Sequence, residues 1–359
     1  MCARVNDNRA GGYRCESGAI PPADSLSRVF HPTGEPCPAM SLDDMIAQAK
    51  LLGFRDAELP YAKFLLGRYS FQHLSEYFPL ITDNEDIPTD FYNLYITMQF
   101  DHDFQAILLR YIGMFELQLR ARYSMTMSEK FGAFAHRDPS RFSNQNYFDG
   151  YLKEYARVLE ACINRRGSKA AESIAKYGDM PIWEAVEEMP FGVVSRLYKN
   201  TKSRQVKEEV ANSFGANQGD FANWLKSLAF VRNRCAHFGK LLGSDLAILP
   251  RAIANVDADN RNPFFIVLLL MHLLRTNLVL PEPMILPQVM ISFEIYALMD
   301  KYDPLIIRAC GIPNNWLELM SDPDVSGMNL IIAENYEKDQ DGNPVTDALK
   351  KRSLEMKIT

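Results

Sequence analysis

FANWLKSLAFVRNRCAHFGKLL, residues 221–242, is the stretch that decides the fold of this chain. Its first half repeats apolar side chains at helical spacing, which predicts one buried face of an α-helix. The residues of this face are Phe221, Trp224, Leu225, Leu228 and either Val231 or Ala229. Asp220 stands where a helix N-cap is expected, and Gly239 supplies a stop signal after a polar cluster. The stretch therefore predicts an amphipathic helix that ends in polar, titratable side chains.

The polar cluster at the end of this helix contains Arg232, Asn233 and His237. Asn233 and His237 stand one helical turn apart on one face, where an amide can hydrogen-bond the imidazole and fix its tautomer. Arg232 lies about 140° around the helix from His237, so the two side chains flank a groove and do not stack. An imidazole that moves protons and a guanidinium that holds a phosphate together suit phosphodiester chemistry.

Plainer interpretations of this cluster stay open. A histidine in the last turn of a helix also stabilises the negative end of the helix dipole, without any catalytic role. The spacing Arg-x4-His is weak evidence alone, because the chain repeats it in RYSFQH, from Arg68 to His73. Tyr69, and not a polar amide, follows the arginine in that second match, so we interpret the second match as part of the core.

The composition is that of a packed globular chain. Hydrophobic residues make up 47% of the 359 residues, which is ample for a core. The formal net charge of −6 excludes a uniformly basic nucleic-acid binder, so any RNA contact depends on local basic patches. The six cysteines form no CxxC pair and no zinc spacing, which indicates reduced thiols in the cytoplasm and no bound metal. The longest apolar run, residues 264–274, is too short for a membrane span and predicts a core helix, and we find no cofactor motif.

Local patterns divide the chain into three parts. Residues 1–39 contain Gly-Gly, Pro-Pro and few periodic apolar positions, which predicts a flexible N-terminal arm. Ser41 and Asp44 form a capping box at the start of a helical domain over residues 40–333. Residues 334–359 are polar and predict a frayed C-terminal tail.

Residues 91–130 predict one or two long helices with an apolar stripe. Glu116 extends this stripe, and Arg120 is its partner one turn later. The pair is either a half-buried structural ion pair or a support that tunes the polar cluster. In the polar stretch 131–150 that follows, His136 has no partner pattern, and we expect it at the surface.

The strongest local charge signal is RLYKNTKSRQVK, residues 196–207, which contains basic residues and no acid. Its basic residues are Arg196, Lys199, Lys202, Arg204 and Lys207. Such a run is either a solvated helix face or a surface that contacts RNA phosphates. The second alternative predicts RNA binding that weakens strongly with salt.

Four blocks of the sequence together resemble abortive-infection (Abi) proteins of the AbiD/AbiF type. The blocks are LLGRYSFQHLSEYF (65–78), QFDHDFQAILLRYIGMFELQLRARY (99–123), MPIWEAVEEMPFGVVSRLYKN (180–200) and WLKSLAFVRNRCAH (224–237). They follow the order of that family within residues 42–320. The last block also resembles the R-[NDH]-x4–6-H motif of HEPN ribonucleases, with Asn233 as the polar residue after the arginine. The segment after His237 departs from the family, because it lacks the usual tryptophan.

The resemblance implies an all-α fold, a HEPN-like helical bundle with additional helices. It implies a homodimer in which Arg232 and His237 of both protomers meet across a two-fold axis. The implied activity is metal-independent cleavage of RNA by its own 2′-hydroxyl, leaving a 2′,3′-cyclic phosphate and a 5′-hydroxyl. His237 would move protons, Arg232 would stabilise the developing charge, and Asn233 would orient His237 or the phosphate. The implied biological role is that of an anti-phage effector whose damage to cellular RNA stops growth.

Two other functions remain in view. The first is a non-cleaving RNA-binding module, in which the motif clamps phosphate and a structured non-coding RNA is the partner. The second is the HEPN half of a nucleotidyltransferase toxin–antitoxin pair. The usual signature of that family has tyrosine two residues after the histidine, where this chain has Gly239, so the sequence disfavours it.

Overall fold

The computed structural model describes residues 40–165, 167–275 and 287–326, and within these ranges it contains helices and no strand. The only extended pairing among the described residues is an isolated bridge between Phe142 and Thr201. The prediction of an all-α fold is therefore confirmed. The proposed arm (1–39) and tail (334–359) lie outside the described residues.

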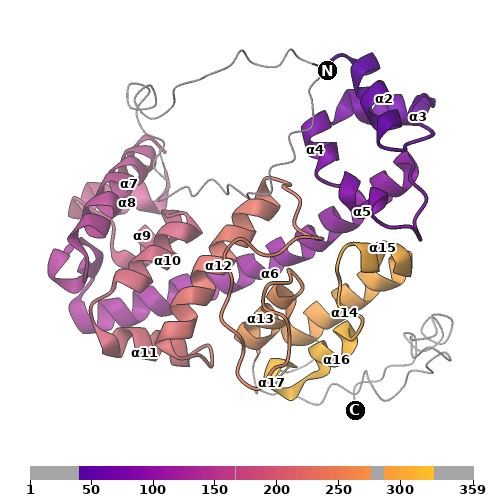
Figure 1. Cartoon of the computed structure of the whole chain (residues 1–359). Coiled ribbons are helices and arrows are strands. Elements are labelled where there is room, and N and C mark those ends of the chain that lie inside the picture. The colour runs from indigo at the N-terminus through magenta and orange to yellow at the C-terminus, as the bar shows by residue number, and fades with distance from the viewer. Residues whose placement is uncertain (1–39, 166, 276–286, 327–359) are drawn as a thin grey trace.

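Four short helices form the N-terminal part of the structure (Figure 1). They are α2 (Leu42–Leu51), α3 (Pro60–Arg68), α4 (Phe71–Ser75) and α5 (Phe78–Thr82). The expected capping box is present, because the Ser41 side chain accepts from the Asp44 amide and the Asp44 side chain accepts from the Ser41 amide. Each of these two donors would otherwise lack a partner at the helix start.

The long helix α6 (Phe91–Phe131) runs the length of the structure, and the other parts are built around it (Figure 1). Asp90 caps its start by accepting from the Asn93 amide, and it ends at Gly132, whose φ of 86° favours glycine. At about 1.5 Å per residue its 41 residues span about 60 Å. The sequence left open one helix or two, and the structure shows one.

The middle of the chain packs as a separate group of helices around the C-terminal half of α6 (Figure 1). Its elements are η1 (Ala135–Arg137), η2 (Pro139–Arg141), α7 (Gln145–Asn164), α8 (Lys169–Tyr177), α9 (Ile182–Glu188), α10 (Phe191–Asn200) and α11 (Arg204–Asn212). Here the prediction of a surface His136 is wrong. The single turn η1 packs under α7, so the His136 ring is fully buried against Tyr155, with centroids 5.2 Å apart.

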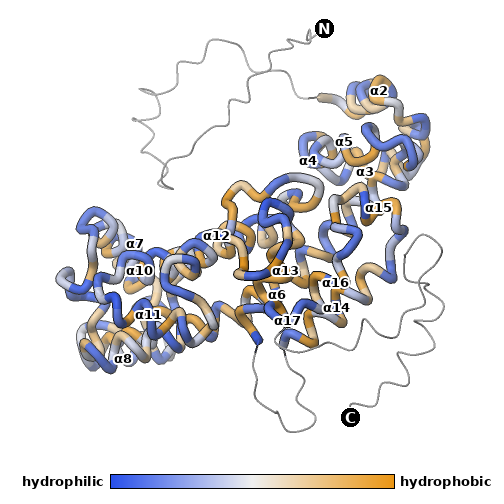
Figure 2. Tube along the Cα trace, turned by 60° about the horizontal axis from the view of Figure 1, so that its bottom comes forward, coloured by the Kyte–Doolittle hydropathy of each residue, from blue (hydrophilic) through white to orange (hydrophobic). Residues whose placement is uncertain are grey.

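The remaining helices are α12 (Gln218–Ala236), α13 (Phe265–Leu274), α14 (Pro287–Lys301), α15 (Pro304–Ala309), α16 (Trp316–Ser321) and α17 (Pro323–Ser326). Of these, α12 lies along the middle of α6 and also packs on α10 and α11, and α13, α14 and α15 contact α6 on the side of the C-terminal helices. Every residue of α13 is buried, as expected for an apolar helix with contacts to α6, α14, α16 and α17 (Figure 2). No helix in the described part of the chain combines the length and the apolar character needed to cross a membrane.

Helices α6 and α12 pack antiparallel, and this packing places the candidate site. At the start of α12, Phe221 contacts Phe115 of α6, with ring centroids 6.1 Å apart. Just beyond the end of α12, Phe238 contacts His102 of α6, with ring centroids 5.3 Å apart. The last turn of α12 therefore lies beside the first half of α6, close to the N-terminal helices.

Candidate functional site at the end of helix α12

Helix α12 begins three residues earlier than the sequence suggested. Asn217 is the N-cap, and its side-chain oxygen accepts from the amides of Gly219 and Asp220, at 3.0 and 2.9 Å. Asp220 therefore lies in the first turn, where its charge still favours the positive end of the helix dipole. The predicted apolar face is confirmed, because Phe221, Trp224, Leu225, Leu228 and Val231 are all buried.

The polar cluster lies outside the core, at the last turn of the helix. Arg232 is half-buried, whereas Asn233 and His237 are exposed. His237 is the C-cap residue, and its backbone N–H donates to the carbonyl oxygen of Asn233 at 3.2 Å. Arg232 Nη1 donates to Asn233 Oδ1 at 3.5 Å, a long contact. Among the described residues no hydrogen bond joins the Asn233 amide to the His237 ring, so the expected side-chain bond between them is not formed in the single chain.

A buried carboxylate on α6 fixes the segment that follows the cluster. Asp101 is fully buried, and its side chain accepts from the backbone amides of Leu241 and Leu242, each at 3.0 Å. It also accepts from Tyr77 Oη at 2.7 Å and from Gln105 Nε2 at 2.9 Å. The Asp101 side chain therefore connects α6 with Tyr77, the N-cap residue of α5, and with the segment that follows α12. Its role could not be predicted from the sequence, because Asp103 stands in the same setting two residues later and only Asp101 is buried.

The turn after the helix is held from a second side by Arg234. Its Nε donates to the carbonyl oxygen of Lys240 at 2.8 Å, and Nη2 forms an ion pair with Glu76 at 3.3 Å. A Cβ on Gly239 would lie 2.8 Å from Arg234 Nε, so this arrangement leaves no room for a side chain at that position. The turn that carries His237 is therefore anchored on α6 and on the N-terminal helices.

A model of the family of Abi-like proteins matches residues 64–242, which include the whole of α12 and the cluster at its end. The chain belongs to the Abi-like protein family. It is thus an abortive-infection protein by family. No curated protein and no solved structure shows a significant match to the chain.

In this Abi-like protein the second Arg-x4-His match is not part of the core. Arg68 is exposed, and its guanidinium lies over the ring of Phe64, 4.9 Å from the centroid. His73 is half-buried, and its ring stacks on His102 with centroids 6.0 Å apart. The earlier interpretation of this segment as core is therefore wrong. Helix α4, which carries His73, is a short helix near the surface, and the His73 ring meets His102 of α6 there.

Glu116 and Arg120 form a buried ion pair that serves the fold. Their side chains are 12% and 8% exposed. Arg120 also donates to the carbonyl oxygens of Val186, Glu187 and Met189, two of them at 2.9 and 2.8 Å, and so satisfies the end of α9. The neighbouring Phe115 marks the start of α12, and His237 lies about 24 Å further along that helix. The pair therefore does not reach the cluster of its own chain.

The basic residues of α10 and α11 also lie away from the cluster. Tyr198 of α10 packs on Phe221 at the start of α12, with ring centroids 5.2 Å apart. Arg196 pairs with Glu154 and Arg204 with Glu208, at 2.9 and 2.7 Å. Lys207 is half-buried. Lys199 and Lys202 are exposed and have no acidic partner within the described part of the chain.

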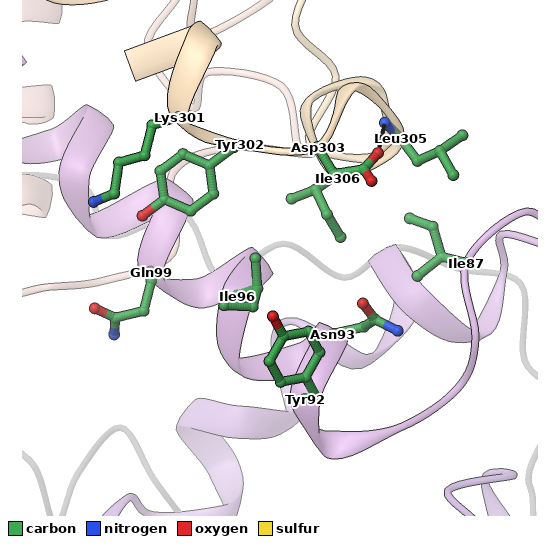
Figure 3. Close-up of a pocket in the computed structure, with 10 residues that line it drawn as sticks. All are labelled: Ile87, Tyr92, Asn93, Ile96, Gln99, Lys301, Tyr302, Asp303, Leu305 and Ile306. Atoms are coloured by element: carbon green, nitrogen blue, oxygen red, sulfur yellow. Dashed lines mark hydrogen bonds between the residues drawn. The ribbon is translucent and has the colours of Figure 1, made fainter. Parts of the chain in front are cut away.

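Two hollows of the described surface lie away from the cluster. One, of about 450 Å³, lies between the first turns of α6, with Tyr92 and Ile96, and the end of α14, with Lys301 and the following Tyr302 (Figure 3). Another, of about 550 Å³, contains Trp224 and His272. Neither is lined by a residue of the cluster, which lies on open surface at a helix end. Such a surface suits a large, extended ligand better than a small enclosed substrate.

Within the described residues, no group of three or more His, Cys, Asp or Glu side chains is arranged to hold a metal ion. The described cysteines, Cys162, Cys235 and Cys310, are free thiols and are buried. Burial raises the pKa of Cys235, which lies within the polar cluster's own turn, to about 12. This thiol therefore stays protonated and is not a nucleophile at neutral pH.

Proposed function

We propose that this Abi-like protein is a HEPN-type endoribonuclease that uses Arg232, Asn233 and His237. The observation that carries this proposal is the position of the three side chains at the exposed end of α12. They take no part in the core, yet the turn that holds them is fixed by buried Asp101 and by Arg234. A rigid turn that presents a cation, an amide and an imidazole to solvent supports chemistry on a large anionic ligand.

The active unit in this proposal is a homodimer. Ideal helical spacing separates positions 232 and 237 by about 140° around α12, so we infer that one chain does not aim both side chains at a single phosphate. A two-fold axis near the end of α12 would place the Arg232 of one protomer beside the His237 of the other. Within one chain Asn233 faces Arg232, which leaves the imidazole free for a partner across the axis.

The chemistry is transfer of the RNA phosphodiester to its own 2′-oxygen. The 2′-hydroxyl attacks the adjacent phosphorus, and the bond to the 5′-oxygen breaks. One imidazole removes the proton from the 2′-hydroxyl, and the second protonates the leaving 5′-oxygen. Arg232 stabilises the charge on the phosphoryl oxygens. The products carry a 2′,3′-cyclic phosphate and a 5′-hydroxyl, and the reaction requires RNA because DNA has no 2′-hydroxyl.

Lys199 and Lys202 provide a second, purely electrostatic contact in this proposal. They are exposed and lack acidic partners among the described residues, unlike Arg196 and Arg204. Each phosphate that a lysine neutralises adds about 0.7 to the slope of log affinity against log salt for single strands. Exchanging both for glutamine should therefore reduce that slope by about 1.4, whereas the paired Arg204→Gln should change it less.

The decisive experiment compares cleavage of tRNA and of single-stranded RNA by wild type, His237→Ala and Arg232→Ala in EDTA. Lys226→Ala is the matched control, because Lys226 is an exposed cation on the same helix. We expect His237→Ala to lose at least about 100-fold in rate, the usual contribution of a general acid–base group. Lys226→Ala should cleave like wild type, and an all-deoxy substrate should remain intact.

The outcomes separate the candidate functions. Cyclic phosphate ends from wild type alone would support the nuclease. Equal, salt-sensitive RNA binding by wild type and His237→Ala without cleavage would instead indicate the RNA-binding module with a structured RNA partner. Cleavage that persists in His237→Ala would remove His237 from the mechanism. For an abortive-infection protein acting in the cytoplasm, the nuclease result would explain growth arrest through damage to cellular RNA.

A further inference from the structure

An aromatic side chain stands exposed directly beside the proposed catalytic histidine. Phe238 is 59% exposed, although its neighbour Cys235 is buried. Its backbone has φ of 51°, in the left-handed region that bulky residues seldom adopt. Such conformations collect at ligand-binding sites, where the surrounding structure holds them in place. The turn therefore presents an apolar ring to solvent at a position where burial would be expected.

The ring of Phe238 is supported from behind by a row of other rings. It contacts His102 edge to face, at 5.3 Å between centroids and 79° between planes. His102 stacks on His73 at 6.0 Å, and His73 stacks on Tyr69 at 6.3 Å. Tyr69, His73 and His102 are each half-buried. The row begins at the proposed active site and leads away from it across α6 to α4.

The charges around this ring favour an anionic ligand. Arg232 and Lys240 flank it in the sequence and are both half-buried, while Arg234 is 42% exposed at its side chain. Arg234 forms an ion pair with Glu76, so Arg232 and Lys240 supply the net positive charge beside the ring. An exposed aromatic ring among cations is the arrangement with which proteins bind single-stranded nucleic acid, since every base has a face that can stack.

We propose that Phe238 is a base-stacking residue for single-stranded RNA, which holds the nucleotide next to the scissile phosphate, and that His102 and His73 position its ring. This inference rests on the proposed nuclease function and assigns the form of its substrate. The stacked base fixes the strand so that the phosphate lies against His237, one residue away. A duplex does not offer an unstacked base, so single-stranded RNA is preferred.

The test measures RNA affinity in the His237→Ala background, which prevents cleavage during the measurement. The probe is a fluorescent single-stranded RNA of uridines, followed by anisotropy. Phe238→Leu keeps an apolar side chain at the same backbone conformation but removes the ring, and Phe238→Tyr keeps the ring. We expect leucine to weaken binding about 5- to 150-fold, the range for one stacked base, and tyrosine to retain affinity within about two-fold. Tyr92→Leu, which removes a ring 63% exposed in the cleft of Figure 3, should leave affinity unchanged.

A second readout separates stacking from a merely structural role. Uridines in the probe are replaced one at a time by abasic nucleotides. If a base stacks on Phe238, one abasic position should weaken binding to the ring-containing protein, which is His237→Ala with Phe238 intact. The same abasic position should leave binding to the protein that also carries Phe238→Leu unchanged. The salt dependence of binding should be the same for both proteins, because a ring neutralises no phosphate. A structural defect would lower affinity for every probe alike.

The outcomes also distinguish this inference from the proposed function. If wild type cleaves RNA and Phe238→Leu binds every probe as the ring-containing protein does, the stacking role is refuted and the nuclease stands. If wild type neither binds nor cleaves RNA, both are refuted. If Phe238→Leu instead converts a dimer to a monomer in light scattering and lowers affinity for all probes equally, Phe238 is a contact between protomers and the stacking role is refuted.

Discussion

Asp101→Asn should loosen the turn that carries the candidate site and destabilise the whole fold. In the structure Asp101 Oδ2 accepts from Tyr77 Oη, Gln105 Nε2 and the Leu241 amide, while Oδ1 accepts from the Leu242 amide. Asparagine has nearly the same shape but only one acceptor oxygen. In its better orientation the amide oxygen keeps the three donors, and the amide nitrogen faces the Leu242 N–H, which then has no partner.

The expected loss follows from these contacts. One buried N–H without a partner costs about 1–3 kcal/mol, and hydrogen bonds to a neutral acceptor are each about 1 kcal/mol weaker than those to a carboxylate. Part of this loss is offset because a neutral amide is easier to bury than a charge. We expect the free energy of unfolding to fall by about 2–4 kcal/mol, which is typical for a broken buried network.

The assay is equilibrium urea unfolding at pH 7, followed by intrinsic fluorescence and far-ultraviolet circular dichroism. Asp103→Asn is the matched control two residues away, because Asp103 is 38% exposed at its side chain and pairs with Lys301 and Tyr302. An exposed pair of this kind contributes at most about 1 kcal/mol. If Asp101→Asn unfolds at the same urea concentration as Asp103→Asn, Asp101 does not hold the turn as argued here.

The remaining predictions concern buried groups elsewhere in the fold. Arg120→Lys should lower the free energy of unfolding by about 3–5 kcal/mol in urea, because lysine cannot replace a guanidinium that bonds several carbonyl oxygens, whereas exposed Arg122→Lys should be neutral. Gly243→Ala should lower the melting temperature, since φ is 71° and the new Cβ would lie 2.3 Å from Leu80; an unchanged melting temperature would contradict this close packing. Burial lowers the pKa of His136 from 6.5 to about 4, so between these pH values the unfolded chain binds one proton more than the folded chain. The contribution of His136 to the free energy of unfolding is therefore fully present above pH 6.5 and falls by about 3 kcal/mol as pH drops toward 4. His136→Gln should flatten that part of the urea stability profile, and identical pH profiles for both proteins would refute it.

Helical periodicity predicted much of the fold. The apolar face of α12 and the helical character of residues 91–130 follow from spacing alone, because an apolar stripe has to be buried wherever it packs, but spacing did not decide between one helix and two. The error at the start of α12 has a local cause. Asn217 and Asp220 are both good capping residues, and only the backbone geometry decides which side chain accepts from the free amides.

Single polar residues were predicted less well, because their burial depends on distant parts of the chain. His136 and His73 carry no periodic pattern, and their positions follow from Tyr155 and His102, which cover them. Asp101 has its backbone partners at residues 241 and 242, far along the chain. The sequence therefore predicted that Arg232 and His237 end a helix, but not the buried carboxylate or the ring row around them.

The length of α6 has a consequence for how the chain folds during synthesis. Arg110 and Tyr111 of this helix bind Glu294, and Asp103 binds Lys301, so its first half is completed by residues made almost 200 positions later. Contacts so distant in sequence form slowly, because a long loop has to close before they contribute. The nascent chain therefore carries α6 with one apolar side in water until α13 and α14 have emerged. From this order of assembly we expect the full chain to depend on chaperones during expression, and chains truncated before α14 to aggregate.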